Sequence, residues 1–227
     1  MFKGRHTYTN KLIKPIIFNP HTLDSNRICI PSHFFNPKAF FIQATFIDPG
    51  TVSCAFRIVR FFYKINIVEV IWFGILKFGK TIQEIISNTE TQLTPILDHL
   101  IHSHYIVIES QPLKRKDVFR CTQHIISFLC SRMSNNGVKG VIVEVDPKLK
   151  TCWIGGPATR IQNDGISIKQ WSKDKAIEIL TMRDDQLSLS TLSSSLYKGR
   201  EDLSDVVCYE YAWWSYYSSR NEIPKSF

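Results

Sequence analysis

Four acidic residues of this sequence stand where strands end or a helix begins. Asp48 and Glu109 each close a run of apolar residues. Asp202 and Asp205 lie three positions apart, which places them on one face of a helical turn. Carboxylate oxygens are the ligands that hard cations such as Mg²⁺ prefer. If the four side chains converge, they would bind two Mg²⁺ ions, or Mn²⁺ in their place, and hydrolyse a phosphodiester bond.

Each of these acids also has a purely structural interpretation. Asp48 precedes Pro49-Gly50 and is typical of a turn. Glu109 could simply be solvated at the end of its strand. Asp202 and Asp205 could form a helix cap and its partner three residues on. The prediction of catalysis therefore rests on the combined positions of the four residues.

Apolar runs predict the strands that carry the first two acids. Three consecutive runs indicate a meander, and two later runs are typical of central strands buried on both faces. In chain order, the five predicted strands cover residues 39–48, 52–62, 67–78, 105–110 and 139–147.

Apolar residues at helical spacing predict four helices, with Pro95 as a point where the first could break. They cover about residues 81–102, 116–132, 173–183 and 203–219. A long loop is expected between residues 151 and 172. The order β-β-β-α-β-α-β-α-α predicts an α/β fold, a mixed five-stranded sheet with helices on its faces.

Composition favours a nucleic acid as the partner. The chain has 28 Lys and Arg against 20 Asp and Glu, a net charge of +8 that attracts polyanions. Its six cysteines include no C-x-x-C pair, which indicates reduced thiols in an intracellular protein. The most apolar stretch, residues 61–78, is interrupted by Lys64, Glu69 and Lys77, so no membrane span is predicted.

Basic residues near the predicted acids are candidates for DNA binding. Lys114, Arg115 and Lys116 follow the Glu109 strand and open a helix, where side chains and free backbone N–H groups can both meet phosphate. Six further residues could extend this surface, namely Lys148, Lys150, Arg160, Lys169, Lys198 and Arg200.

Two segments keep more than one interpretation. Residues 1–38 form a basic N-terminal arm, either a strap over the core or a phosphate-binding extension. It precedes a domain expected at residues 39–219, with a tail at 220–227. The aromatic residues of the last helix favour a core or a dimer interface over stacking on DNA bases; they are Trp213, Trp214, Tyr216 and Tyr217.

Five sequence motifs, taken together, resemble a known family. FIDPGT and VIESQ carry the first two acids, VEVDPKLKTCWIGG and KDKAIEIL follow, and EDLSDVVCYEYAW carries the last two. In this order, over about residues 40–217, they resemble the RuvC-like Holliday junction resolvases of the RNase H-like superfamily. The basic continuation SQPLKRK is more similar to the poxvirus and fungal mitochondrial branches than to the bacterial proteins.

The resemblance implies an activity and a set of partners. The four acids occupy the family's acidic positions, and Lys173 or Lys175 falls where the family carries an active-site lysine. The implied protein is a homodimer that binds a four-way DNA junction and nicks two strands of like polarity. No membrane and no small-molecule cofactor is expected. The implied location is intracellular: the viral DNA replication site in the host cytoplasm for a viral protein, otherwise the mitochondrion or the nucleus.

Other functions fit the same residues. The N-terminal arm and the loop between Gly156 and Lys173 depart from the bacterial enzymes, so the DNA structure is less determined than the nuclease chemistry. A related nuclease acting on other branched or flapped DNA is one alternative, and a non-catalytic DNA-binding subunit is another. Sugar or acetate kinases also begin with a strand ending in D-x-G-T, but their fold is much longer, and their adenosine-binding glycine motif is missing here.

Overall fold

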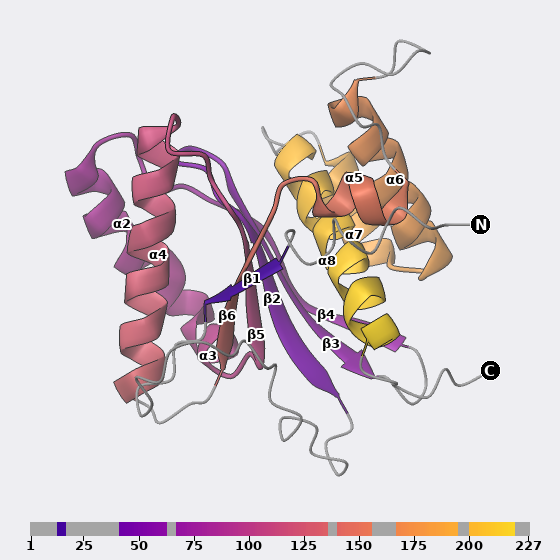
Figure 1. The fold of residues 1–227 in the computed structure, drawn as a ribbon, viewed down its shortest axis with the longest axis horizontal. Helices are drawn as coiled ribbons and strands as arrows, with labels where there is room; N and C mark the ends of the chain where they lie inside the picture. The colour runs from indigo at the N-terminus through magenta and orange to yellow at the C-terminus, as the bar shows by residue number, and fades with distance from the viewer. Residues whose placement is uncertain are drawn as a thin grey trace.

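The computed structural model describes residues 13–16, 41–62, 67–135, 140–155, 167–194 and 200–220. Its strands are β1 (Ile13–Ile16), β2 (Ile42–Asp48), β3 (Cys54–Phe62), β4 (Ile67–Leu76), β5 (Tyr105–Glu109) and β6 (Val141–Val145). Within the described ranges they form one sheet in the order β1-β6-β5-β2-β3-β4, with helices on both faces (Figure 1). The predicted α/β architecture, an RNase H-like mixed sheet flanked by helices, is confirmed.

The sheet combines an antiparallel meander with a parallel half. β2, β3 and β4 pair antiparallel in sequence, whereas β2, β5 and β6 run parallel. All five predicted strands are present in the predicted order. The structure adds β1, which pairs antiparallel with β6. This strand comes from residues 1–38, for which the sequence predicted an irregular arm, because its short run next to prolines gives too little periodicity to recognise.

Helices follow the strands as alternation predicts. They are α2 (Ile82–Leu93), the 3-10 turn η2 (Thr94–Ile96), α3 (Leu97–Ile101), α4 (Lys116–Asn135), α5 (Leu149–Ile154), α6 (Ile168–Met182), α7 (Gln186–Ser193) and α8 (Arg200–Arg220). Pro95 lies in η2, where it separates α2 from α3. No helix in the described part of the chain is both long enough and apolar enough to cross a membrane.

Two predictions about the later helices were wrong. The expected loop at residues 151–172 contains most of α5, and α6 begins at Ile168 because the Ser167 side chain accepts a hydrogen bond from the Gln170 N–H. The expected connecting segment before the last helix contains α7, which Asp185 caps in the same way. Helices α5 and α7 have only 6 and 8 residues, so neither has enough turns to show the apolar periodicity that identifies a helix from sequence.

Each face of the sheet packs its own hydrophobic core. Helices α2, α3 and α4 cover one face, and α5 to α8 cover the other (Figure 1). Along β5 the side chains alternate between the two cores: Tyr105 and Val107 pack on the α8 side, and Ile106 and Ile108 on the α4 side. A strand buried on both faces must be apolar throughout, which explains its uniform sequence.

The pairing of β2 with β5 brings the first two acids together. Ile47 lies opposite Ile108 in this parallel pair, so Asp48 and Glu109 follow at the same edge of the sheet. Phe46, two residues before Asp48, belongs to the core on the α8 side. Because side chains alternate along a strand, Asp48 and Glu109 point toward that helix.

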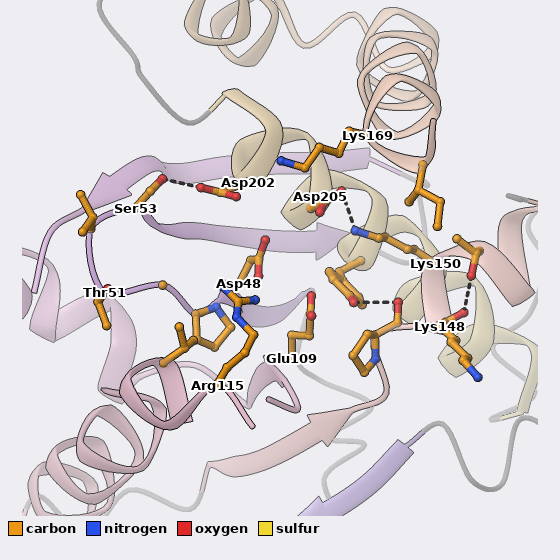
Figure 2. A pocket seen from close by; sticks show the side chains of 18 residues that line it. Asp48, Thr51, Ser53, Glu109, Arg115, Lys148, Lys150, Lys169, Asp202 and Asp205 are labelled. Atoms are coloured by element: carbon orange, nitrogen blue, oxygen red, sulfur yellow. Dashed lines mark hydrogen bonds and ion pairs between the residues drawn. The ribbon is translucent and has the colours of Figure 1, made fainter. Parts of the chain in front are cut away.

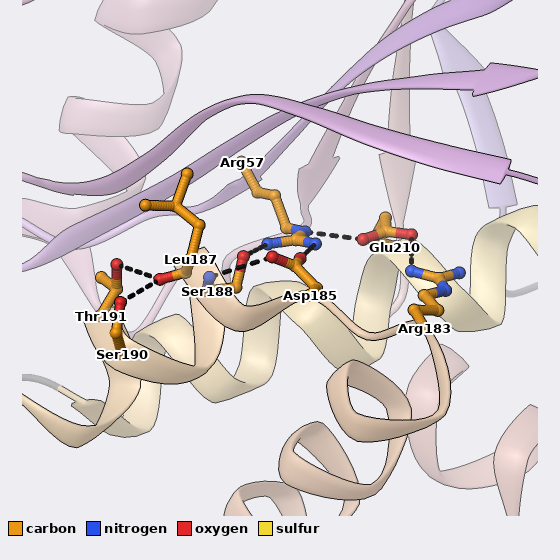
Figure 3. A network of polar contacts seen from close by, with 8 residues as sticks. All are labelled: Arg57, Arg183, Asp185, Leu187, Ser188, Ser190, Thr191 and Glu210. Carbon is orange, nitrogen blue, oxygen red and sulfur yellow. Dashed lines mark hydrogen bonds and ion pairs between the residues drawn. The ribbon is translucent and has the colours of Figure 1, made fainter.

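A buried ionic network fixes α8 against the sheet (Figure 3). Arg57 of β3 is 0% exposed and donates to Glu210 of α8 at 2.7 Å. It also donates to Ser188 at 2.7 Å and to Asp185 at 2.8 Å, both at the start of α7. Arg183 contacts the second oxygen of Glu210 at 2.5 Å. Two positive and two negative side chains therefore balance beneath the helix that carries Asp202 and Asp205.

We expect Arg57→Met to lower the free energy of unfolding by about 3–5 kcal/mol, because it leaves Glu210 and Asp185 without their buried cation. Arg60→Met is the matched control on the same strand. Arg60 pairs with the exposed Glu69 at 3.3 Å and donates to Gln43 at 3.1 Å, so its loss should cost less, about 1–2 kcal/mol. Urea unfolding measures both, and equal costs would contradict the role assigned to the network.

Candidate active site

A cavity of about 620 Å³ opens where β2 and β5 end. All four predicted acids line it: Asp48 and Glu109 from the strand ends, and Asp202 and Asp205 from the first turns of α8. In Figure 2 the two strand acids face the two helix acids across one space. The convergence that the sequence predicted is therefore present, and it involves three separate elements of the fold.

The turn after β2 is shaped for this cavity. A side chain at Gly50 would place its Cβ 2.1 Å from the Ser53 carbonyl oxygen, so only glycine fits this turn. The tight turn brings Ser53 to α8, where its hydroxyl donates to Oδ2 of Asp202 at 2.5 Å. Asp48 thus ends its strand at a turn, as its structural interpretation held, and also lines the cavity.

Lys150 of α5 lies among the acids. It was predicted to contact DNA, yet the residue is only 5% exposed. Its Nζ lies 2.5 Å from Oδ1 of Asp205 and 5.0 Å from the centre of the Tyr209 ring. Figure 2 shows this side chain pointing into the acidic cluster, whereas Lys148 points away from it. Lys150 is therefore placed to act on a reacting phosphate within the cavity.

Uncharged side chains hold the acids in place. Ser172 of α6 donates to Oδ1 of Asp205 at 2.5 Å, and the Gln111 amide lies 3.4 Å from Glu109. The Tyr209 hydroxyl donates to the Pro147 carbonyl at 2.9 Å, which ties α8 to the turn before α5. No local pattern indicates the two serines, because serine is common and their partners lie 149 and 33 residues away. Tyr209 could have been found, since it follows Asp205 by one helical turn.

Burial and mutual repulsion act against ionisation of these acids. Burial raises the pKa of Asp48 well above its ordinary value, and the nearby charges of Glu109 and Asp205 add to this effect, while Lys150 opposes it. Burial likewise raises the pKa of Glu109 and of Asp202. For Lys150 burial favours the neutral amine, but the acids outweigh it and raise the pKa. The cluster thus keeps the Lys150 ammonium charged and would gain from a further cation.

The donor set has the chemistry that Mg²⁺ requires. Four carboxylates from three elements line one cavity, and hard divalent cations take oxygen ligands of this type. Within the described ranges, no three His, Cys, Asp or Glu side chains are already arranged as a metal site. Asp205 instead contacts the Lys150 ammonium. The residues fit a divalent ion by the chemistry of their oxygen donors and by their place in one cavity.

The predicted basic residues divide into two groups. Arg115 and Lys169 line the cavity beside the acids, and Lys169 is also paired with Glu201. Lys148 lines the cavity too, whereas Lys114 and Lys116 are exposed at the start of α4. Three of these five residues therefore line the cavity, and Lys114 and Lys116 lie outside its lining.

Neither predicted active-site lysine is among the residues that line the cavity. Both form ion pairs elsewhere: Nζ of Lys173 lies 3.7 Å from Oε1 of Glu201, and Nζ of Lys175 lies 2.6 Å from Oε1 of Glu178. Lys150, which is buried, and Lys169, which is exposed, line the cavity instead. Arg160, Lys198 and the side chain of Arg200 fall outside the described part of the chain.

The aromatic residues of α8 pack into the protein. Trp213 and Tyr217 are buried in the core on that face. Trp214 stacks on Phe61, with ring centres 4.1 Å apart, and Tyr216 contacts Trp153 edge-on. The preference for packing over base stacking is confirmed for the buried pair.

The strand order and the helices on both faces define a mixed α/β fold that can be compared with known structures. No known family and no curated protein sequence matches this chain. Among solved structures it is similar to the yeast mitochondrial Holliday junction resolvase Ydc2, with a TM-score of 0.51 and 10% identity over 86% of this chain and 92% of the other. It is also similar to the fowlpox virus resolvase in complex with substrate Holliday junction DNA, with a TM-score of 0.51 and 16% identity over 78% and 98%. At these identities the likeness establishes the fold.

We expect Asp48→Asn to stabilise the metal-free protein by about 0.5–2 kcal/mol near neutral pH, because it removes a charge that burial and neighbouring acids disfavour. An acid whose pKa is raised by folding binds its proton more tightly in the folded state. The wild type therefore loses stability as the pH rises from the unfolded-state pKa of Asp48 to its folded-state pKa. The gain should therefore shrink toward acid pH. Urea unfolding with a chelator measures it, and Asp174→Asn, at an exposed position, is the control. A neutral-pH loss of stability would refute this assignment.

Proposed function

We propose that this protein is a Mg²⁺-dependent endonuclease that resolves four-way DNA junctions as a homodimer. The observation that carries the proposal is the convergence of Asp48, Glu109, Asp202 and Asp205 on one cavity, at the strand ends of an RNase H-like sheet. The likeness in fold to two Holliday junction resolvases supports the choice of substrate.

The four carboxylates would hold the metal ions, with Mn²⁺ as a substitute for Mg²⁺. Bound there, the metal would activate the attacking water and neutralise charge on the leaving oxygen. Lys150 holds its ammonium beside Asp205, where it would stabilise negative charge that builds on the phosphate. Tyr209 keeps that ammonium in place through its ring face. Arg115 and Lys169, on opposite walls, would bind the phosphates that flank the cleaved bond.

A homodimer suits the substrate by symmetry. A four-way junction presents two equivalent strands related by a two-fold axis, and a pair of identical subunits presents two cavities in the same relation. One nick in each strand would then separate the junction into two duplexes. The net charge of +8 would draw the protein to such a polyanion.

Cleavage of defined DNA structures tests this function directly. The protein is incubated with Mg²⁺ and a four-way junction, a Y-fork or a flap, and the nicks are mapped. We expect paired symmetric nicks in the junction, and Asp48→Asn should abolish them while preserving junction binding. Asymmetric cuts in the flap alone would favour the alternative nuclease. Full activity of Asp48→Asn would refute the assigned chemistry, and junction binding without cleavage by the wild type would favour the binding subunit.

Two lysine variants separate catalysis from binding. Lys150→Gln should slow cleavage by about 10²–10³-fold with little change in junction affinity, because Lys150 lies inside the acidic cavity. Lys114→Gln removes an exposed cation, so it should weaken binding to all DNA structures and reduce the salt dependence of binding by about one ion. Single-turnover cleavage and binding titrations at several salt concentrations measure both. Equal losses of affinity in the two variants would contradict the role of Lys150.

A further inference from the structure

Two serine hydroxyls contact the acids of α8 from opposite sides. Ser53, in the turn after β2, donates to Oδ2 of Asp202, and Ser172, in α6, donates to Oδ1 of Asp205, both at 2.5 Å. Figure 2 shows the first of these bonds at the rim of the cavity. Neither serine belongs to α8, so two different elements hold the carboxylates of one helix.

Each serine occupies one oxygen of its carboxylate and leaves the other free. Ser53 contacts Oδ2 of Asp202, and both Ser172 and Lys150 contact Oδ1 of Asp205, so these contacts do not use Oδ1 of Asp202 or Oδ2 of Asp205. A carboxylate with one oxygen held cannot turn freely about its last bond. The other oxygen of each carboxylate therefore keeps a fixed orientation at the cavity that Asp202 and Asp205 line.

A hydroxyl suits this task better than a charged group. Lysine or arginine would orient a carboxylate equally well but would also neutralise it, as Lys150 does in part for Asp205. A serine hydroxyl donates one hydrogen bond and leaves the full negative charge available to a cation. Hydrogen bonds of this kind orient metal ligands in many proteins.

The contact of Ser172 is also well supported by packing. Ser172 is 0% exposed, and its backbone carbonyl accepts a hydrogen bond from the Cys208 thiol of α8 at 3.5 Å. Cys208 lies one turn beyond Asp205 on the same helix. The hydrogen bond between Cys208 and the Ser172 carbonyl thus fixes the backbone of Ser172 against α8. The packing of α6 on α8 therefore sets the position of the Ser172 hydroxyl relative to Asp205.

We propose that Ser53 and Ser172 are positioning residues of the metal site, which orient Asp202 and Asp205 and thereby set the affinity for divalent ions. This inference rests on the proposed function, because it requires that the acids bind metal. The residues need not touch substrate, so their effect should appear in metal binding by the protein without DNA.

Titration of the full chain with Mn²⁺, followed calorimetrically in the absence of DNA, tests the proposal. We expect Ser53→Ala and Ser172→Ala each to weaken Mn²⁺ binding by about 10–100-fold. Ser53→Thr keeps the hydroxyl and should bind nearly as tightly as the wild type. Ser103→Ala is the matched control: Ser103 is buried and bonded to Thr45 at 2.7 Å, but it precedes β5 at the opposite end of that strand, so its loss should leave Mn²⁺ binding unchanged.

The outcomes distinguish this inference from the function on which it rests. Absence of Mn²⁺ binding by the wild type would overturn the proposed metal site as a whole. Wild-type binding with unchanged affinity in both alanine variants would overturn the role of the serines alone. Thermal unfolding verifies that each variant is folded. If buried Ser172 does not tolerate alanine, the half-buried Ser53 still decides, through the difference between its alanine and threonine variants.

Discussion

Electrostatic repulsion among four neighbouring carboxylates is the constraint that the rest of this structure must satisfy. Asp48, Glu109 and Asp202 all have raised pKa values because burial and like charges disfavour their ionised forms. A fold that placed them on mobile loops would let them move apart. Here two of the acids end paired strands and two open a long helix, so the energy of the sheet and its two cores holds them together.

The position of α8 decides whether the site exists at all. The register of β2 against β5 fixes the positions of Asp48 and Glu109. Asp202 and Asp205 reach them only if α8 has the correct rotation about its axis and the correct position along it. Buried Arg57 sets the rotation by binding Glu210, which lies on the side of the helix that faces β3. The hydrogen bond from the Tyr209 hydroxyl to the Pro147 carbonyl fixes the position of α8 along its axis. Arg57, outside the cavity lining, and Tyr209, within it, thus both determine where α8 places its acids.

Sequence alone predicted what depends on local periodicity. The strands of Asp48 and Glu109 were recognised because they are apolar along their length, and the helix of Asp202 was recognised by its spacing. The meeting of Asp48 and Glu109 was predicted only on the condition that their strands lie side by side, and the parallel pairing of β2 with β5 meets that condition. Short helices such as α5 and α7 lack the periodicity to be seen, and the Arg57 network joins residues 128 to 153 positions apart, which no local pattern reveals.

The lysines show how this limit affects a functional prediction. The family resemblance implied Lys173 or Lys175, which lie in the fourth motif, as the active-site lysine. The helix of that motif begins earlier than predicted, at Ile168, and it is Lys169 that lines the cavity. Lys150 was grouped with exposed phosphate contacts because the short helix α5 was not foreseen. Once α5 is present and packed on α8, Lys150 faces Asp205 and not the solvent. An error of a few residues in a helix boundary therefore changes which lysine lines the cavity, whereas the acids, which end β2 and β5 or open α8, lie where the sequence predicted.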